Sequence, residues 1–315
     1  STPSILIFGD STADTGNNNY IPTIFRSNFP PYGLRFLNHT PTGRFSDGRI
    51  AADFFAKHLG IKEYVPPYLD PDLTLEELIT GVSFAFAGSG YDPLTASISS
   101  VISVPEQLNH FRDYKRKLEA KIGTEKTKES IGKALFLVSA GTNDFVLNYF
   151  ILPIRRQRYS VEAYASFVVN IVGRFVQGLV SEGARRIGVA GLPPMGCLPV
   201  VITLFSDDPI NKRDCIENFS ILSRAYNRML QTSLNAMNAE LRRRHRGSPR
   251  VAYLDVYGPL EAIIHNHGHD FEEVNVGCCG TGLVEASILC TPFAPLCSHP
   301  AKYVFWDSIH PTETT

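Results

Sequence analysis

The sequence lacks long apolar runs and an excess of charge of either sign. Its 315 residues carry 30 lysines and arginines against 31 aspartates and glutamates, a formal net charge of −1. Nucleic acid and anionic membranes attract strongly basic chains, so neither is an expected partner. The longest apolar run, around residues 134–138, is strand-sized, whereas a membrane helix needs roughly 20 apolar residues. We therefore expect a soluble chain with no transmembrane segment.

Cysteine is absent from the N-terminal half, and no two cysteines have the Cys-x-x-Cys spacing of a metal site. The six cysteines of the second half are Cys197, Cys215, Cys278, Cys279, Cys290 and Cys297. An even number in a loop-rich region predicts three disulfides and hence an oxidising compartment. The alternative is a cytosolic protein whose unpaired cysteines are buried as small apolar side chains.

Two further features favour secretion. The chain begins with Ser1 instead of methionine, without a basic segment followed by an apolar one, as in a mature protein after signal-peptide removal. Asn38-His-Thr40 and Asn218-Phe-Ser220 have the sequence of N-glycosylation sites, a triplet that also arises by chance. We expect a secreted, extracellular glycoprotein with glycans at Asn38 and Asn218.

No internal repeat, low-complexity tract or Pro/Gly/Ser linker divides the sequence, which predicts a single domain over residues 1–315 and a monomer. Strand-like apolar runs occur at residues 5–8, 82–86, 134–138, 187–190, 251–254 and 303–306. Helical patterns lie between most of them. Alternating strands and helices predict a mainly parallel sheet with helices on both faces, because parallel strands need crossover connections.

The clearest helical pattern lies between Ser160, a plausible N-cap, and Gly183, a stop signal. One face of this helix carries Tyr164, Phe167, Val168, Ile171, Val172, Phe175, Val176, Leu179 and Val180. Residues 105–120 and 218–243 are also helix-like.

Ser11 follows the first apolar run within Phe8-Gly-Asp-Ser-Thr12. A buried strand that ends abruptly in these residues places Ser11 at the carboxyl end of a strand, where open α/β sheets bind ligands. Ala13 stands where a Gly-x-Ser-x-Gly elbow has its second glycine, so that motif is absent. The alternative is an ordinary turn serine, since Gly, Asp and Ser all form turns.

Other polar segments also follow expected strands, namely residues 87–90, 141–144 and 307–310. The carboxyl ends of parallel strands share one edge of a sheet, so these segments are expected to lie near Ser11.

A serine hydroxyl needs a base to act as a nucleophile, and neutral imidazole suits that task. His310 is the candidate base, and Asp307 is the candidate partner of its other ring nitrogen. Acyl transfer also needs donors for an oxyanion, and the N–H groups of Ser11 and Gly88 and the amide of Asn143 are suitable. In isolation His310 fits an exposed loop, Asp307 and Asn143 fit turns or caps, and Gly88 fits a tight turn.

The chain resembles the plant branch of the GDSL esterase/lipase family, within the SGNH hydrolases, over nearly its whole length. The blocks that carry the resemblance are Phe8-Gly-Asp-Ser-Thr12, Gly16-Asn-Asn-Asn-Tyr20, Pro31-Tyr-Gly33, Thr42-Gly-Arg-Phe-Ser46, Gly88, Gly141-Thr-Asn-Asp144, Gly191-Leu-Pro-Pro-Met-Gly-Cys-Leu-Pro199, Gly277-Cys-Cys-Gly-Thr-Gly282 and Asp307-Ser-Ile-His310-Pro-Thr-Glu313. Several long motifs in the right order are specific, whereas a lone Gly-Asp-Ser would not be.

The resemblance implies a three-layer α/β/α sandwich around a central, mainly parallel, flavodoxin-like sheet. It implies Ser11 as the nucleophile, Asp307 and His310 as the rest of a triad, Gly88 and Asn143 in the oxyanion hole, and no metal or organic cofactor. Thr12 replaces the leucine usual in the family, which leaves the nucleophile's chemistry unchanged. Ser83 and Phe86 replace residues common around the second block, so the role of Gly88 rests on weaker grounds than that of Ser11.

Three other patterns have plainer readings. The histidines of the segment 265–270 could bind a metal, but a polar loop accounts for them. The basic runs 115–117 and 242–246 are typical of solvated helix ends. The neighbours Cys278 and Cys279 are expected to close loops with Cys290 and Cys297 in an order that stays open, and Cys197 is then left to pair with Cys215.

The sequence therefore predicts a secreted serine ester hydrolase that forms an acyl-enzyme at Ser11. The candidate substrates are small-molecule, lipid or polysaccharide esters: cell-wall acetyl esters, cutin-type acyl esters and phenolic esters. One alternative is an acyltransferase that uses the same triad to acylate an alcohol. Another is a non-catalytic carbohydrate- or lipid-binding protein on the same fold.

Overall fold

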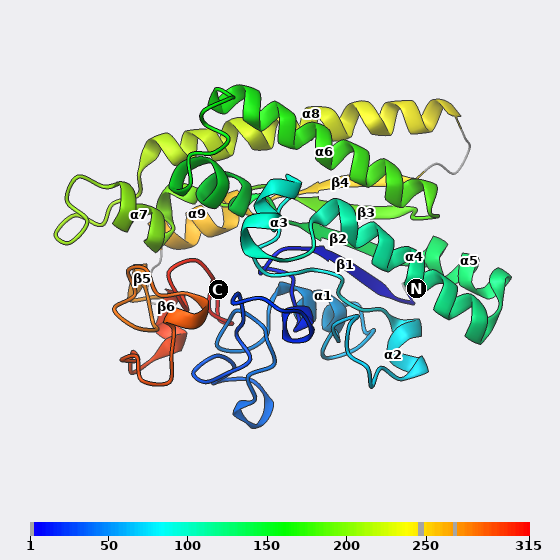
Figure 1. The fold of residues 1–315 in the computed structure, drawn as a ribbon, viewed down its shortest axis with the longest axis horizontal. Helices are drawn as coiled ribbons and strands as arrows, with labels where there is room; N and C mark the ends of the chain where they lie inside the picture. The colour runs from blue at the N-terminus through cyan, green and yellow to red at the C-terminus, as the bar shows by residue number, and fades with distance from the viewer. Residues whose placement is uncertain (1–2, 245–248, 267–269) are drawn as a thin grey trace.

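A four-stranded parallel sheet forms the centre of the molecule. The computed structural model describes residues 3–244, 249–266 and 270–315. The strands are β1 (Ile5–Gly9), β2 (Leu135–Ser139), β3 (Arg186–Ala190) and β4 (Arg250–Leu254), in the spatial order β1-β2-β3-β4 (Figure 1). Parallel strands covered on both faces are rich in Val, Ile, Leu and Phe, which is the composition of β1 and β2. Their carboxyl ends share one edge, as expected.

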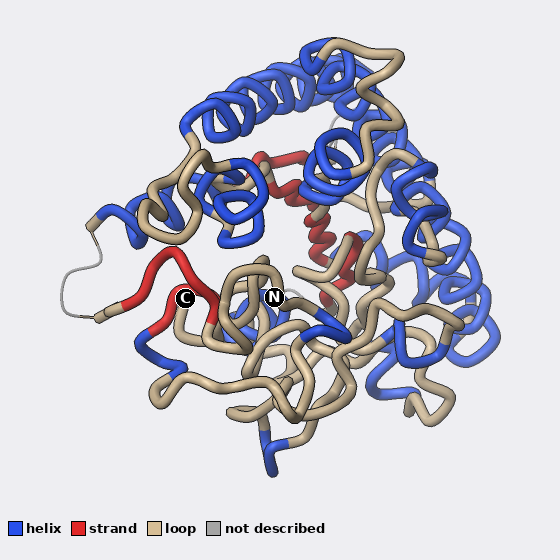
Figure 2. Tube along the Cα trace, turned by 60° about the vertical axis from the view of Figure 1, so that its left-hand side comes forward, coloured by secondary structure: helices blue, strands red, loops and turns tan. Residues whose placement is uncertain are grey.

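Helices connect and cover the strands. They are α1 (Ala51–His58), α2 (Leu75–Thr80), α3 (Pro93–Ser99), α4 (Val104–Ile122), α5 (Thr124–Lys133), α6 (Val161–Ser181), α7 (Pro199–Phe205), α8 (Glu217–Arg244) and α9 (Tyr257–His265). Shorter helical turns are η1 (Asn17–Tyr20), η2 (Leu37–His39), η3 (Asp144–Ile151), η4 (Met195–Cys197), η5 (Ser287–Leu289) and η6 (Pro300–Lys302). Figure 2 shows helices along one side of the sheet and long loops over much of the other side.

The side chains of β1 divide the core into two layers. Leu6 and Phe8 pack into the larger apolar cluster, which contains the buried faces of α4, α6 and α8. Ile5 and Ile7 point to the opposite side, where they pack with residues of α1. Alternate residues of a strand face opposite sides of a sheet, so α1 and the α4–α6–α8 layer lie on different faces. The fold is therefore a three-layer α/β/α arrangement, as the resemblance to the SGNH hydrolases implied.

Helix α6 confirms its predicted boundaries. The Ser160 hydroxyl accepts a hydrogen bond from the N–H of Ala163 at 3.2 Å, and the helix ends at Ser181, two residues before Gly183 with its φ of 111°. Among the described helices, α6 is the one with the length and hydropathy of a membrane span. Since its apolar face is buried in the larger core cluster with residues of α4 and α8, we interpret it as a buried core helix.

The prediction of a strand at residues 82–86 was wrong. This segment runs beside β1, with the N–H of Phe84 donating to Ile7 O at 2.7 Å, but it forms only isolated bridges. The reason is that its other backbone groups bind side chains and the loop at residues 66–68. The Asn17 amide donates to the carbonyls of Ser83 and Ala85, at 2.8 and 2.9 Å, where a neighbouring strand would otherwise bind.

The last expected strand exists but lies outside the central sheet. β6 (Tyr303–Phe305) pairs with β5 (Glu273–Gly277) in a separate two-stranded parallel sheet. Sequence analysis did not identify β5, since this short run is only half-buried and carries a polar residue at every second position. Asp307 thus reaches the site from a small neighbouring sheet and not from the central one.

Three disulfides cross-link segments of the C-terminal half of the chain. Cys197 pairs with Cys215, Cys278 with Cys297, and Cys279 with Cys290. The first pair is the expected one, and the other two give the order that the sequence left open. The last two bridges lie in the loops around β5 and β6, where the small buried cluster has few other apolar side chains.

Candidate active site

The structure brings Ser11, His310 and Asp307 together from opposite ends of the chain. His310 Nε2 lies 2.7 Å from Ser11 Oγ, and Nδ1 lies 2.7 Å from Asp307 Oδ2. Exposed fractions are 8% for Ser11, 4% for His310 and 0% for Asp307. The three side chains therefore form a continuous hydrogen-bonded row that is fully buried at Asp307 and slightly exposed at His310 and Ser11.

Ser11 occupies its position because β1 ends where two backbones approach closely. Gly9 has a φ of 144°, and a Cβ there would lie 1.8 Å from Ser139 O in β2, so no other residue fits. The Gln107 side chain of α4 binds both backbone groups of Gly9, at 2.9 and 2.8 Å. Asp10 then accepts hydrogen bonds from the N–H and hydroxyl of Thr12, both at 2.9 Å. These bonds fix the turn on both sides of Ser11.

His310 and Asp307 sit on one tight loop after β6. Asp307 Oδ1 accepts the N–H groups of Ile309 and His310 at 2.9 and 2.7 Å, and the Trp306 N–H donates to His310 O at 2.8 Å. The Phe45 ring packs 5.0 Å from the imidazole, centroid to centroid. Backbone bonds across the loop therefore set the angle at which His310 meets Ser11.

Sequence analysis missed a fourth member of this row, Tyr32. Its hydroxyl donates to Asp307 Oδ2 at 2.8 Å and accepts the N–H of Ser287 at 2.8 Å. Burial and the neighbouring Asp307 raise the pKa of Tyr32 well above its ordinary value, so its hydroxyl stays protonated and donates. The family resemblance covered Tyr32 without giving it a role, and its local sequence carries no signal of a contact with Asp307.

The candidate oxyanion donors also lie on fixed loops. Within the described residues, neither the N–H of Ser11 nor that of Gly88 donates to a protein acceptor. Gly88 has a φ of 81°, and a Cβ there would lie 2.8 Å from Ser99 Cβ. Asn143 Nδ2 donates to Ser89 O at 2.9 Å, which places this amide against the residue after Gly88 and leaves its second hydrogen for another acceptor.

Side chains of the first loop hold the Gly88 segment in place. The Asp14 carboxylate accepts the N–H of Ala87 at 3.0 Å, and the Asn18 amide donates to Ala87 O at 2.9 Å. Burial raises the pKa of Asp14 to about 6. The Gly16-Asn-Asn-Asn-Tyr20 block therefore supports the second loop, a function that its sequence alone did not reveal.

Asp144 performs the same task for the neighbouring loop. Its carboxyl accepts the N–H groups of Tyr91 and Asp92 at 2.9 and 3.0 Å and the Thr95 hydroxyl at 2.7 Å. Burial raises the pKa of Asp144 to about 7. Because Asp144 follows Asn143 directly, these bonds also fix the position of the Asn143 backbone.

An apolar cavity of about 720 Å³ adjoins His310 and Thr12 on the α1 face of the sheet. Its apolar walls come chiefly from α1 and α9, and include Phe45, Ile50, Phe54, Val256, Leu260 and Ile263. Ser11 is not part of the lining. The cavity therefore offers room for an apolar group beside the base, next to the reacting hydroxyl.

Where the structure describes them, the other sequence patterns, the histidine-rich segment 265–270 and the basic runs 115–117 and 242–246, are not part of this site. Among the described residues, no group of three or more histidines, cysteines and carboxylates could hold a metal ion, and residues 267–269 of the histidine-rich segment lie outside them. Lys115 binds Glu182 in the loop after α6, at 2.8 Å. Arg242 lines a cavity with Arg185 and Arg250 at the amino ends of β3 and β4, the end of the sheet opposite to Ser11.

Comparison with known proteins decides the family. The profile of the GDSL-like lipase/acylhydrolase family matches residues 5–315. The chain belongs to this family. It is 56% identical to the GDSL esterase/lipase At5g45960 of Arabidopsis thaliana, over all of this chain and 84% of that protein. It is 46% identical to the GDSL esterase/lipase At1g06990 of the same plant, over 99% of this chain and 85% of that protein. As a family member, the chain is a carboxylic ester hydrolase.

Proposed function

We propose that this GDSL family member is a secreted serine hydrolase that cleaves carboxylic esters through an acyl-enzyme at Ser11. The observation that carries the proposal is the 2.7 Å contact of His310 Nε2 with Ser11 Oγ, backed by Asp307 on the other ring nitrogen. A base within hydrogen-bond reach of the nucleophile, itself oriented by a carboxylate, is the geometry that serine acyl transfer needs.

In the first half of the proposed reaction, Ser11 Oγ attacks the ester carbonyl carbon while its proton passes to His310 Nε2. The negative charge that develops on the carbonyl oxygen is stabilised by the N–H groups of Ser11 and Gly88 and by the Asn143 amide. When the intermediate collapses, the bond to the alcohol oxygen breaks and His310 gives its proton to that oxygen. The alcohol leaves, and the acyl group remains on Ser11.

In the second half, water attacks the acyl carbon and His310 accepts its proton. Collapse of this second intermediate breaks the bond to Ser11 Oγ, which regains a proton from His310 Nε2, and releases a carboxylic acid. Asp307 stays hydrogen-bonded to His310 Nδ1 and stabilises the imidazolium in both halves.

Ser11→Ala tests this mechanism. We expect the variant to keep its fold and to lose both hydrolysis of a short-chain nitrophenyl ester and labelling by a fluorophosphonate. Ser97→Ala is the matched control, because Ser97 is an exposed serine of α3 whose hydroxyl binds Pro93 O within the same helix. Near wild-type activity in Ser11→Ala would show that Ser11 is not the nucleophile.

Fluorophosphonate labelling also separates an enzyme from a carbohydrate- or lipid-binding protein, since a binder would not react. The acyltransferase alternative shares every residue of the mechanism, and an alcohol takes the place of water in its second half. Product analysis with and without an acceptor alcohol distinguishes the two: a hydrolase yields free acid in both cases, whereas a transferase yields a new ester when the alcohol is present.

Secretion is supported by the three disulfides and by the exposure of both candidate glycosylation sites. Asn38 lies on η2 and Asn218 at the start of α8, and both side chains are exposed. We propose an extracellular location in the plant cell wall. Mass spectrometry of the protein isolated from a cell-wall wash should find glycans at these two asparagines. If the protein were found only in the cytosolic fraction, the proposed extracellular location would be refuted.

The apolar cavity beside His310 favours lipid or cutin-type acyl esters over acetylated polysaccharide. Pockets for apolar ligands are lined by aliphatic and aromatic side chains, as this one is. We expect kcat/KM on nitrophenyl esters to rise with acyl length from acetate to octanoate. Leu260→Asn should reduce the octanoate value more than the acetate value. A higher kcat/KM on the acetate ester than on the octanoate ester in the wild type would show that the cavity does not bind the acyl chain.

A further inference from the structure

Within the described part of the chain, Tyr32 is the one group distant in sequence that binds the Asp307 carboxylate. Three of the four donors to this carboxylate, the N–H of Ile309, the N–H of His310 and His310 Nδ1, belong to the loop that carries it. The fourth is the Tyr32 hydroxyl, 275 residues away in sequence. Backbone bonds such as that from the Glu313 N–H to Asp47 Oδ1 at 2.7 Å hold the rest of this loop, and the Tyr32 bond is the one that joins the carboxylate itself to the N-terminal loops.

The ring of Tyr32 is held as firmly as its hydroxyl. Its exposed fraction is 1%, and its centroid lies 5.8 Å from that of Phe29, 5.7 Å from Phe45 and 6.2 Å from Trp306. Phe45 also packs against His310, so one aromatic cluster surrounds both partners of Asp307. A rigid ring gives its hydroxyl one direction, and that direction is toward Asp307 Oδ2.

Ser287 fixes the other side of the hydroxyl. It adopts a left-handed conformation with a φ of 51°, and its own hydroxyl accepts the Arg26 N–H at 2.9 Å and donates to Arg26 O at 2.8 Å. The Ser287 N–H therefore points at Tyr32 from a segment that is tied to the N-terminal loop. Because this N–H donates, the tyrosine hydroxyl must donate its own hydrogen to Asp307.

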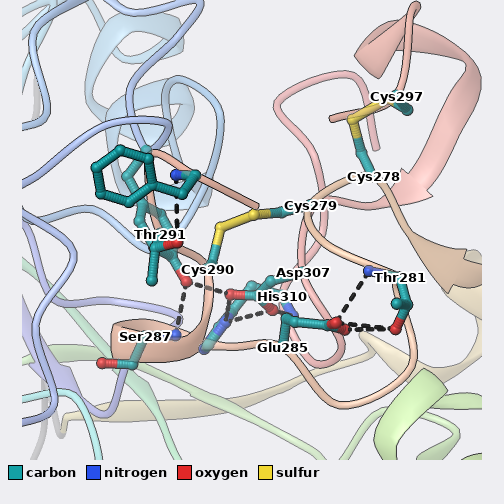
Figure 3. Close-up of a disulfide and its surroundings, with 12 residues drawn as sticks. Cys278, Cys279, Thr281, Glu285, Ser287, Cys290, Thr291, Cys297, Asp307 and His310 are labelled. Carbon is teal, nitrogen blue, oxygen red and sulfur yellow. Dashed lines mark hydrogen bonds and ion pairs between the residues drawn. A yellow bond between two sulfur atoms is a disulfide. The ribbon is translucent and has the colours of Figure 1, made fainter. Parts of the chain in front are cut away.

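The Cys279–Cys290 disulfide holds this segment against the histidine loop. The Cys290 N–H donates to Ser287 O at 2.9 Å, and the Cys279 N–H donates to the carbonyl of Trp306, the residue before Asp307, at 2.8 Å. Figure 3 shows the bridge above Ser287, with Asp307 and His310 beside it. The disulfide thus links two segments: the one with Ser287, which orients the Tyr32 hydroxyl, and the one after β6 that carries Asp307.

We propose that Tyr32 is a positioning residue for ester hydrolysis. Its hydroxyl, oriented by the Ser287 N–H, holds Asp307 in the angle that keeps His310 directed at Ser11, and the Cys279–Cys290 disulfide keeps Ser287 in place. This inference rests on the proposed function, since it assigns Tyr32 a role in the same reaction. Tyr32 touches no reacting atom and acts only through Asp307.

Tyr32→Phe removes the hydroxyl and keeps the packed ring. We expect kcat to fall about tenfold, the effect of losing one hydrogen bond to a charged group, with KM within about twofold of the wild type. Tyr114→Phe is the matched control, because Tyr114 is equally buried and its hydroxyl donates to Leu78 O at 2.6 Å, far from the site. This control should lower the melting temperature and leave kcat unchanged.

Proton NMR gives a readout that a loss of stability alone would not move. The proton between His310 Nδ1 and Asp307 should resonate at low field, and its signal should shift or broaden in Tyr32→Phe but not in Tyr114→Phe. A kcat loss of fivefold or more in Tyr32→Phe, with a changed signal, supports the proposal. A smaller loss in kcat, or an unchanged signal, overturns it.

The double variant Cys279→Ser/Cys290→Ser tests the disulfide's part and carries the whole test if Tyr32→Phe does not fold. We expect it to lower kcat with little change in KM, and to have no additional effect in the Tyr32→Phe background, because both changes break the same link. Wild-type kcat, or additive losses, would refute that link. Ser11→Ala distinguishes failure of the proposed function from failure of the positioning role: if Ser11→Ala abolishes activity while Tyr32→Phe leaves kcat unchanged, only the positioning role fails.

Discussion

At the residue scale, the side chains of the reactive row are fixed mainly by backbone groups. Asp307 accepts two N–H groups of its own loop, and Ser11 follows a glycine that Gln107 binds on both backbone atoms. Groups held in this way lose little freedom when a substrate arrives, so they keep the geometry that proton transfer requires.

Asp307→Asn should reduce kcat by about three to four orders of magnitude and change KM little. The physical reason is that an amide can donate to His310 Nδ1, which favours the tautomer whose proton sits on Nε2 and cannot accept one from Ser11. The neutral amide also no longer stabilises the imidazolium. The measurement is kcat and KM on a short-chain ester, with Asp72→Asn, an exposed loop carboxylate, as the control.

An unchanged kcat in Asp307→Asn would show that this carboxylate does not orient the base.

At the element scale, the sequence predicted the strands and helices that are stabilised by burial of their own apolar side chains. The strands β1, β2 and β3 bury nearly continuous apolar runs, and helix α6 buries apolar residues at the helical period; both patterns are visible in the sequence. The segment 82–86 has a similarly apolar composition, but the carbonyls of Ser83 and Ala85 bind the side chain of Asn17, about 66 residues away in the chain. No local pattern encodes that competition.

Ser160→Ala should lower the free energy of unfolding by about 1 kcal/mol and leave kcat unchanged. The Ser160 hydroxyl satisfies one of the free N–H groups at the start of α6, and alanine cannot replace it. Urea unfolding measures the loss. Ser181→Ala, at the other end of the same helix, is the control, because its hydroxyl only binds Gln177 O one turn earlier and alanine favours the helix. Equal stabilities of the two variants would contradict the capping role.

At the scale of the whole molecule, the sequence placed Ser11, Gly88, Asn143 and His310 near one edge of a sheet. The topology of parallel strands explains this for Ser11 and Asn143, which follow β1 and β2. Gly88 instead follows a segment that is not a strand, and His310 follows β6 of the separate sheet. The supporting groups were not predictable in the same way. Tyr32 binds Asp307 across the whole length of the chain, and only the folded arrangement of the small C-terminal sheet brings the two together.

The buried carboxyls also predict how the stability of the whole molecule depends on pH. Burial raises the pKa of Asp144 from its ordinary value of 3.8 to about 7, and that of Asp14 to about 6. A carboxyl with a raised pKa in the folded state binds more protons folded than unfolded. Its contribution to stability is therefore fully present below the unfolded pKa and is lost as pH rises through the folded pKa. For Asp144 the loss is roughly 4 kcal/mol at most.

Asp144→Asn isolates this contribution, because asparagine keeps the shape of the side chain but does not titrate. We expect the variant to be less stable than the wild type at pH 5, and the gap to narrow by pH 8 as Asp144 ionises in the wild type. Asp113→Asn is the control: hydrogen bonding to Tyr68 lowers the pKa of Asp113 to about 2, so it stays ionised over this range and its effect should be the same at both pH values. Urea unfolding at pH 5, 6, 7 and 8 measures the gap. A constant gap for Asp144→Asn would show that Asp144 is already ionised in the folded protein at pH 5, held by the three donors that surround it.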